Sequence, residues 1–523
     1  MIRLTVALLL SVLLVRPAPA QQATFDLIIR NGRVLDGTGN PWIRGDIGIR
    51  GDAIAAIGDL SKATARRVID AQDRYVTPGF IDVHSHAGPG LEDRALGAGL
   101  PLLAQGITTV VVNPDGGGPT DLAAQRRRLG THGIGVNVAL MVPHGSVRRE
   151  VLGMSDRAPS AAELERMRSI VRAGMDAGAF GLSSGPYYAP GSYAKTDELI
   201  TLAHIAAQYR GVYASHIRDE SDYSIGLLGA IEEVIQIAET AKLPGVVTHI
   251  KALGPNVWGF SMAAIDRIER ARARGVEIFA DQYPWDASST GLSAALVPRW
   301  AQVGGDSAMV RRFDDPRERD RLRAEMRVNL ARRGGADRLM ISRHPAEASL
   351  EGKTLAGIAA SRNTDQVETA ITILKAGGAG VVSFNMIEDD IAAFMRRPWT
   401  ITSSDGGLVP MGEGVPHPRA YGTFPRKLRL YVKERGVVGL EDAIRSMTAL
   451  PASVFRMPDR GQIRVGAKAD LAIFDLDAVR ELATYQNPHQ ISEGISYVVV
   501  NGAVAFENGR ATSSRHGTVL SRP

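Results

Sequence analysis

Apolar and polar positions alternate along short stretches at both ends of the chain, and this period of two is typical of β-strands. Near the beginning, two such stretches flank the Asn-Gly pair at 31–32, which is a strong hairpin signal. Near the end, another two flank the Asn-Gly pair at 501–502. Because short strands need a partner surface to bury their apolar faces, we predict that residues 24–75 and 455–512 form one small composite β-sandwich.

The middle of the chain has a different pattern, in which short apolar runs alternate with helix-like stretches such as 161–177 and 225–241. This order predicts βα units and a parallel sheet. Eight candidate strands occur, so we predict an α/β fold, a (β/α)8 TIM barrel over residues 76–454. The stretch 282–404, between the seventh and eighth candidate strands, is far longer than one connection requires. We therefore predict an insertion around 290–397 that covers the active site.

The first twenty residues have the pattern of a secretory signal peptide. Arg3 precedes an apolar run at 4–15 that is too short for a membrane anchor, and Ala-Pro-Ala follows at 18–20. Cleavage after Ala20 predicts an exported protein, periplasmic or secreted. No later segment is apolar enough to cross a membrane, so we expect no membrane anchor after signal cleavage.

Composition narrows the chemistry. The chain has no cysteine, which excludes disulfides, zinc–thiolate sites and a cysteine nucleophile. Hydrophobic residues make up 44% and charged residues 22%, as in ordinary soluble enzymes. The net charge of +5 is small and dispersed, which argues against nucleic acid as a partner. No Gly-x-Ser-x-Gly elbow occurs, so a serine hydrolase is not supported. The pattern leaves open whether the protein is an oligomer.

Polar residues follow the apolar runs of the predicted barrel, at the end where barrel enzymes build their active sites. His84 and His86 alternate on the first strand, so both side chains face the same side. His216 and His249 end the fifth and sixth strands, and Asp405 ends the eighth. One histidine at a strand end is usually structural. Several imidazoles and a carboxylate that converge on one mouth instead predict a site for a borderline divalent metal such as zinc.

Three motifs give the chain a resemblance to a known family. GFIDVHSH at 79–86 resembles the first-strand motif of the amidohydrolase superfamily, and the segment 461–471 is similar to part of its closing sandwich. More narrowly, HPRAYGTFPR at 417–426 resembles the D-aminoacylase (N-acyl-D-amino-acid deacylase) family. The resemblance extends over 25–510. It implies metal-dependent hydrolysis of a linear amide bond in a small N-acyl-D-amino acid, with one or two divalent ions such as Zn²⁺.

The resemblance also implies roles for individual residues. The metal ligands that match the family are His84, His86, His216 and His249. Asp405 matches the catalytic aspartate, which takes a proton from the attacking water and passes it to the leaving amine. Arg419 matches the arginine that holds the substrate carboxylate. The other substrate-binding positions are Lys251, Tyr283 and Ser289.

The chain departs from the family in one position. Where the family usually has a cysteine ligand after the second strand, this chain has Asp115, in a Pro-Asp-Gly sequence. A carboxylate can bind and bridge zinc, so we predict that Asp115 is a ligand. The alternative is that Asp115 only shapes a turn, which is a common role of that sequence.

Other functions stay open as alternatives. A dipeptidase for D-residue dipeptides differs from a deacylase only in the acyl group. A cyclic amide hydrolase shares the barrel, but the fourth strand ends in Ser183 and Ser184, with no lysine for a carbamylated bridge. A non-catalytic binding protein would be expected to lack the metal ligands. We further predict that Arg218 and Glu220 brace His216. His144 and Arg148 follow the third strand and either touch the substrate or shape a loop.

Overall fold

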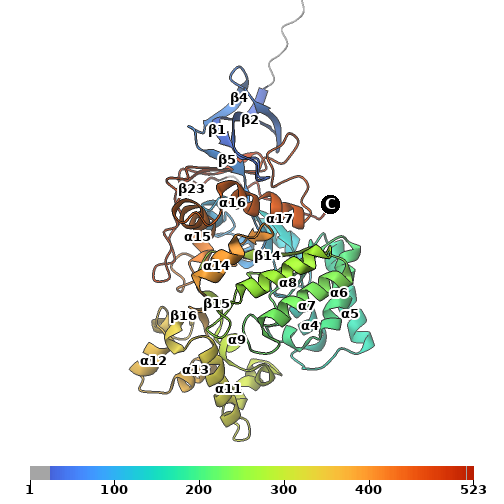
Figure 1. Ribbon diagram of the computed structural model, residues 1–523, viewed down its shortest axis with the longest axis vertical. Helices are drawn as coiled ribbons and strands as arrows, with labels where there is room; N and C mark the ends of the chain where they lie inside the picture. Colours follow the sequence, from blue (N-terminus) through green and yellow to red (C-terminus); the bar gives the residue numbers. More distant parts are fainter. Residues whose placement is uncertain (1–23, 514) are drawn as a thin grey trace, which may run out of the picture.

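The computed structural model describes residues 24–513 and 515–523, so the predicted signal peptide lies outside the described residues. Figure 1 shows three parts along the long axis of the molecule. A β-sheet that contains the N-terminal strands lies at the top, the barrel lies in the middle, and a yellow lobe lies at the bottom. No helix in the described part is long and apolar enough to cross a membrane.

Eight parallel strands form the barrel, as predicted, and three of them are interrupted. In chain order the strands are β6 (Phe80–Asp82) with β7 (Ser85–His86), β8 (Ile107–Val112), β9 (Asn137–Leu140) with β10 (Val142–Pro143), β11 (Gly181–Ser184), β12 (Val212–Ser215), β13 (Gly245–Val247), β14 (Ile278–Gln282), and β18 (Thr400–Thr402) with β19 (Gly406–Gly407). Neighbouring strands pair in parallel from β6 to β9 and from β10 to β18. The parallel pair β7–β19 closes the circle. All carboxyl ends therefore meet at one mouth.

Helices surround the barrel. They are α1 (Gly88–Glu92), α2 (Leu100–Leu103), α3 (Leu122–Thr131), α4 (His144–Leu152), α5 (Ala161–Asp176), α6 (Thr196–Gln208), α7 (Gly226–Ala241), α8 (Ser261–Ala273), α14 (Glu388–Met395), α15 (Arg419–Arg426), α16 (Leu440–Met447) and α17 (Ala449–Val454). A capping box starts α5, in which Ser160 Oγ accepts from Glu163 N–H and the Glu163 carboxylate accepts from Ser160 N–H. Helix α7 buries Ile231, Val234 and Ile235 in the main core, as its 3.6-residue period requires.

Both ends of the chain enter one nine-stranded sheet. Its strands are β1 (Thr24–Val34), β2 (Ile43–Arg50), β3 (Ala53–Gly58), β4 (Thr64–Asp70), β5 (Tyr75–Pro78), β20 (Leu471–Phe474), β21 (Ile495–Val500), β22 (Ala503–Glu507) and β23 (Arg510–Ala511). The antiparallel pair β5–β20 joins the two ends, with Val76 opposite Ile473. Both of these side chains lie in the separate hydrophobic core of this sheet.

Between β14 and β18 the chain leaves the barrel and forms the lobe at the bottom of Figure 1. The lobe contains β15 (Ser288–Gly291), α9 (Leu292–Leu296), α10 (Asp306–Arg312), α11 (Arg319–Arg332), β16 (Leu339–Arg343), α12 (Leu355–Ser361), α13 (Gln366–Lys375) and β17 (Gly380–Ser383). The strands β15, β17 and β16 form an antiparallel sheet, and the lobe has its own hydrophobic core. Its first strand, β15, borders the barrel mouth, so the lobe supplies one wall of the cavity described next.

Candidate metal centre and substrate cavity

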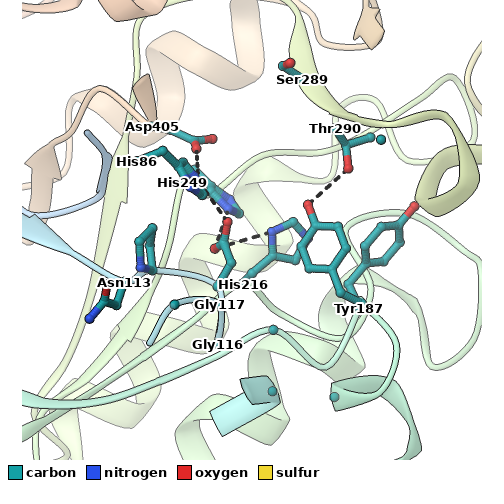
Figure 2. Close-up of a pocket in the computed structure, with 18 of the residues that line it drawn as sticks. His86, Asn113, Gly116, Gly117, Tyr187, His216, His249, Ser289, Thr290 and Asp405 are labelled. Carbon is teal, nitrogen blue, oxygen red and sulfur yellow. Dashed lines mark hydrogen bonds and ion pairs between the residues drawn. The ribbon is translucent and has the colours of Figure 1, made fainter. Parts of the chain in front are cut away.

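The carboxylate of Asp115 lies between four histidines. Its Oδ1 is 3.3 Å from His84 Nε2, 3.7 Å from His216 Nδ1 and 3.5 Å from His249 Nε2. Its Oδ2 is 3.2 Å from His86 Nε2. Figure 2 shows the labelled His86, His216, His249 and Asp405 gathered around one point of the cavity. We call Asp115 and the four histidines around it the histidine cluster. Its five residues come from the ends of the first, second, fifth and sixth strands.

The backbone at this mouth is strained. Asp115, His249 and Asp405 have φ angles of 56°, 37° and 49°, in the left-handed region that residues with a side chain rarely adopt. Such conformations persist at functional sites, where the surrounding structure holds them. For Asp115 this means that the loop residue has turn geometry and also directs its side chain at the histidines. The two interpretations of Pro-Asp-Gly are therefore compatible.

The residues fit a divalent metal ion. Buried polar atoms without a hydrogen-bond partner in the described chain include His84 Nε2, Asp115 Oδ1 and both ring nitrogens of His216. Leaving such atoms unpaired is costly, and a shared cation removes that cost. The candidate ligand atoms form two groups, and within each group all of these atoms lie within 4.8 Å of one another. Asp115 belongs to both groups. The first group is His84, His86, Asp115 and Asp405, and the second is Asp115, His216 and His249. Nitrogen and oxygen donors of this kind suit zinc.

The electrostatics prepare the imidazoles for different roles. Burial lowers the pKa of His216 to about 3, so this ring is neutral and offers a lone pair. Burial also disfavours the charged form of His86, but Asp115 and Asp405 outweigh it and raise the pKa of His86 to about 10. Of the two rings, only His86 therefore has to lose a proton before it can bind a cation.

Asp405 is held from both sides. Its Oδ1 is 3.2 Å from His86 Nε2, while its Oδ2 is 2.8 Å from Arg419 Nη1. Burial favours the neutral acid, but the Arg419 cation and the imidazoles hold the pKa of Asp405 well below its usual range. The carboxylate is therefore ionised and able to accept a proton.

Two buried aspartates fix the loop that carries Asp405. Asp82, on β6, accepts from the backbone N–H of Ser404 at 2.9 Å and from its hydroxyl. Burial raises the pKa of Asp82 to about 6 despite these bonds. Asp281, on β14, accepts from Ser403 Oγ at 2.5 Å and from His249 N–H at 2.8 Å. Neither aspartate is among the site residues predicted from the sequence, although each stands at the end of a barrel strand.

Lys251 and Glu220 form a buried pair beside the cluster. Lys251 Nζ donates to Glu220 Oε1 at 2.5 Å and lies 2.7 Å from His249 Nδ1. Glu220 Oε1 is 3.0 Å from His249 Nδ1, whereas its Oε2 is 3.9 Å from His216 Nε2. Glu220 is therefore closer to His249 than to the histidine it was predicted to brace. The prediction for Arg218 is wrong, because this guanidinium pairs with Glu233.

A cavity of about 690 Å³ opens over the cluster. We call it the substrate cavity. Its walls include all the predicted site residues except the more deeply buried His84, namely His86, Asp115, His216, His249, Lys251, Tyr283, Ser289, Asp405 and Arg419. The guanidinium of Arg419 lies over the ring of Tyr283, 4.7 Å from its centroid. Ser289 lies on β15, so the lobe contributes this position. The volume of the substrate cavity suits a ligand of drug or metabolite size.

Other polar residues near the mouth have different roles. His144 and Arg148 are fully buried and both pair with Glu198, which supports the loop-shaping alternative for them. Tyr187 and Arg333 also line the substrate cavity but are not among the site residues predicted from the sequence. No local motif marks either residue. Arg333 follows α11, in the lobe, and reaches the cavity only through the folding of that lobe.

A (β/α)8 barrel with four imidazoles and carboxylates at the carboxyl ends of its strands defines the class of metal-dependent hydrolases. The comparison with known families agrees. The Amidohydrolase family matches residues 67–506, and the chain belongs to this family as a metal-dependent amidohydrolase.

Several characterised proteins are similar over nearly their full length. An N-acyl-D-glutamate deacylase of Alcaligenes xylosoxydans xylosoxydans is 36% identical, over 96% of this chain and 97% of its own. A D-aminoacylase of the same organism is 33% identical, over 95% and 98%. Among solved structures, the N-acyl-D-glutamate deacylase of Bordetella bronchiseptica, complexed with zinc and a phosphonate inhibitor, superposes with a TM-score of 0.82. It is 33% identical over 96% of this chain and 100% of its own.

Proposed function

We propose that the protein is a zinc-dependent deacylase of N-acyl-D-amino acids. The observation that carries the proposal is that one cavity joins the histidine cluster, the ionised Asp405 and the cation Arg419. A linear substrate with a free carboxylate can then reach the hydrolytic centre and the cation at once. The relatives named as D-amino-acid deacylases support both the reaction and the configuration of the released residue.

The residues around Tyr283 in the cavity wall explain how the substrate binds. Arg419 presents a planar guanidinium that matches a carboxylate, and Lys251 adds a second cation 5.7 Å from the centroid of the Tyr283 ring. Held between this wall and the histidine cluster, the Cα of the substrate has two of its four substituents fixed. The side chain and the hydrogen must then occupy different places, which favours one enantiomer.

Asp405 carries out the proton transfers of the reaction. His84, His86, Asp115, His216 and His249 would hold the metal, and a divalent ion supplies an activated water and polarises the acyl oxygen. The Asp405 carboxylate lies beside His86, accepts the proton of the attacking water at Oδ1, and transfers it to the leaving nitrogen. Arg419 keeps the carboxylate ionised for the first transfer and fixes its orientation through Oδ2.

The experiment that tests the proposal is a hydrolysis screen with zinc analysis of the same sample. N-acetyl-D-amino acids, their L-enantiomers, D-residue dipeptides and hydantoins are compared. We expect cleavage of the N-acetyl-D-amino acids and at least about one zinc per chain. Equal rates for D and L forms, or faster cleavage of a cyclic amide, would overturn it.

We also propose that the protein is exported, with cleavage after Ala20, and acts in the periplasm or outside the cell. The motif that supports this is the basic start, short apolar run and Ala-Pro-Ala sequence of residues 1–20. Fractionation of cells that produce the full chain tests it, together with N-terminal sequencing. Export would leave Gln21 as the first residue, and an intact Met1 in the cytoplasm would contradict it.

A further inference from the structure

Arg333 is a buried cation in the wall of the substrate cavity. Its side chain is 1% exposed, and its Nη2 donates to the Tyr187 hydroxyl at 3.0 Å. Its guanidinium also lies 6.0 Å from the centroid of the Tyr223 ring. Its Nε and Nη1 have no hydrogen-bond partner among the described residues. No carboxylate within 4.0 Å pairs with it in the part of the chain that the structure describes, whereas the preceding Arg332 pairs with Asp222 at 3.1 Å. A buried guanidinium left in this way is costly.

The surroundings of Arg333 are positive as well. Tyr187 lies between Arg333 and the histidine cluster, with its ring centroid 5.2 Å from that of His216. A second cation, Arg299, lies over the same tyrosine, 4.1 Å from its ring centroid, and donates to the Ala294 carbonyl. Among the described residues, neither Arg333 nor Arg299 forms an ion pair with a carboxylate. This side of the cavity therefore has an excess of positive charge that the chain itself does not balance.

A structural role explains this arrangement poorly. An arginine at the end of a helix commonly donates to the last carbonyls of that helix, and Arg333 directly follows α11. Its guanidinium instead reaches Tyr187 and the cavity, with two nitrogens unpaired. A ligand anion is the group that would satisfy them, since a carboxylate accepts two parallel N–H bonds from a guanidinium.

We propose that Arg333 binds the side-chain carboxylate of the substrate, so that the preferred substrates are N-acyl derivatives of acidic D-amino acids. This inference rests on the proposed function and names its substrate class. Arg419 receives the α-carboxylate on one wall, and Arg333 receives the second carboxylate beyond Tyr187. The two cations are thus specificity elements for the two carboxylates of the amino-acid half of the substrate, while the amide bond lies at the histidine cluster.

The test compares N-acetyl-D-glutamate with the neutral, nearly isosteric N-acetyl-D-glutamine, and uses N-acetyl-D-leucine as an apolar reference. In the zinc-loaded wild type we expect kcat/KM to be at least about 10-fold higher for the glutamate derivative. In Arg333→Met that value should fall by roughly 100-fold, with a change below about 3-fold for the other two substrates. Arg333→Lys should retain part of the preference, because it keeps the positive charge but lacks the two parallel N–H donors of the guanidinium.

Arg332→Met is the matched control, because it also removes an arginine from this helix end. Arg332 pairs with Asp222 and does not line the cavity. It should change all three substrates equally. If Arg333→Met does not fold, the kcat/KM ratio of the wild type for the acidic and neutral substrates still tests the substrate class. Inhibition of the wild type should likewise be stronger by D-glutamate than by D-glutamine. Similar wild-type rates for the acidic and neutral substrates would overturn the inference but leave the deacylase function intact. No cleavage of any N-acyl-D-amino acid would overturn both.

Discussion

Arg419 donates to the carboxylate of Asp405, with Nη1 2.8 Å from Oδ2, and both side chains are buried. The candidate base and the candidate carboxylate anchor therefore form one ion pair. A substrate carboxylate that binds the remaining N–H groups of Arg419 arrives next to the residue that transfers the proton. Substrate position and proton transfer are coupled through this contact.

The first prediction concerns Asp405. Asp405→Asn keeps the shape of the side chain but cannot accept the proton, so kcat should fall by roughly 100-fold or more. The amide can still accept from Arg419, and the fold and zinc content should be retained. Single-substrate kinetics and elemental analysis of the same sample check both points. Turnover close to that of the wild type would assign the proton transfer to another residue.

The second prediction concerns Asp115, whose two oxygens face all four histidines. Asp115→Ala should lose zinc, because a bound cation would lose one of its anionic ligands. Asp115→Cys should keep part of the zinc, since a thiolate also binds this metal. Metal content after gel filtration and the shift of Tm on zinc addition measure the effect independently of activity. Normal zinc binding by Asp115→Ala would restrict this residue to shaping its turn.

The third prediction concerns Arg419. Arg419→Ala should weaken kcat/KM for a free-acid substrate by about 2–4 kcal/mol, the scale for removing one partner of a buried charge pair. The α-carboxamide of the same substrate should lose less, because it never used the cation and is affected only through Asp405. The ratio of the two losses is the measurement. Equal losses would mean that Arg419 acts only by orienting Asp405.

The fourth prediction concerns stability and pH at Lys427, which is buried and donates to Thr402 Oγ1 and Ser446 Oγ, each at 2.8 Å. Burial, partly opposed by Asp442, lowers the pKa of Lys427 from 10.5 to about 7. Between these values the unfolded chain holds a proton that the folded chain has released. This group therefore makes the protein more stable as pH rises, by up to about 1.4 kcal/mol per pH unit.

Lys427→Met removes that slope. The variant should exceed the wild type in stability most near pH 7, and the difference should shrink toward pH 10. Urea unfolding at pH 7, 8.5 and 10 gives the comparison. Lys433→Met is a suitable control because Lys433 is 41% exposed. Parallel stability curves for the wild type and Lys427→Met would contradict the prediction.

The barrel and most of the cluster are predictable from the sequence because their signals are local. His84 and His86 stand two residues apart after an apolar strand, and His216, His249 and Asp405 each follow another. In a parallel barrel all such positions meet at one mouth, so strand order alone brings them together. The position of Asp115 also follows a strand, but its left-handed backbone is a property of the folded loop.

Contacts between distant segments are not predictable in this way. The partner of Arg218 is Glu233, on α7, which the neighbouring sequence of Arg218 does not reveal. Arg333 directly follows a polar helix that contains many arginines, and only the packing of the lobe brings it to the cavity. Asp82 and Asp281 bond to residues 322 and 122 positions away, respectively. Such pairings depend on tertiary geometry rather than on spacing along the chain.

The pairing of β5 with β20 has a consequence for biosynthesis. Because Val76 finds Ile473 only after nearly the whole chain has been made, the N-terminal strands leave the ribosome with an open sheet edge. An open edge can pair with another chain, and so nascent molecules are exposed to misassociation for most of translation. Closing so long a loop also slows folding. A chain that stops before β20 should thus aggregate even though its barrel strands and the histidine cluster are complete, so correct assembly depends on the segment 471–523.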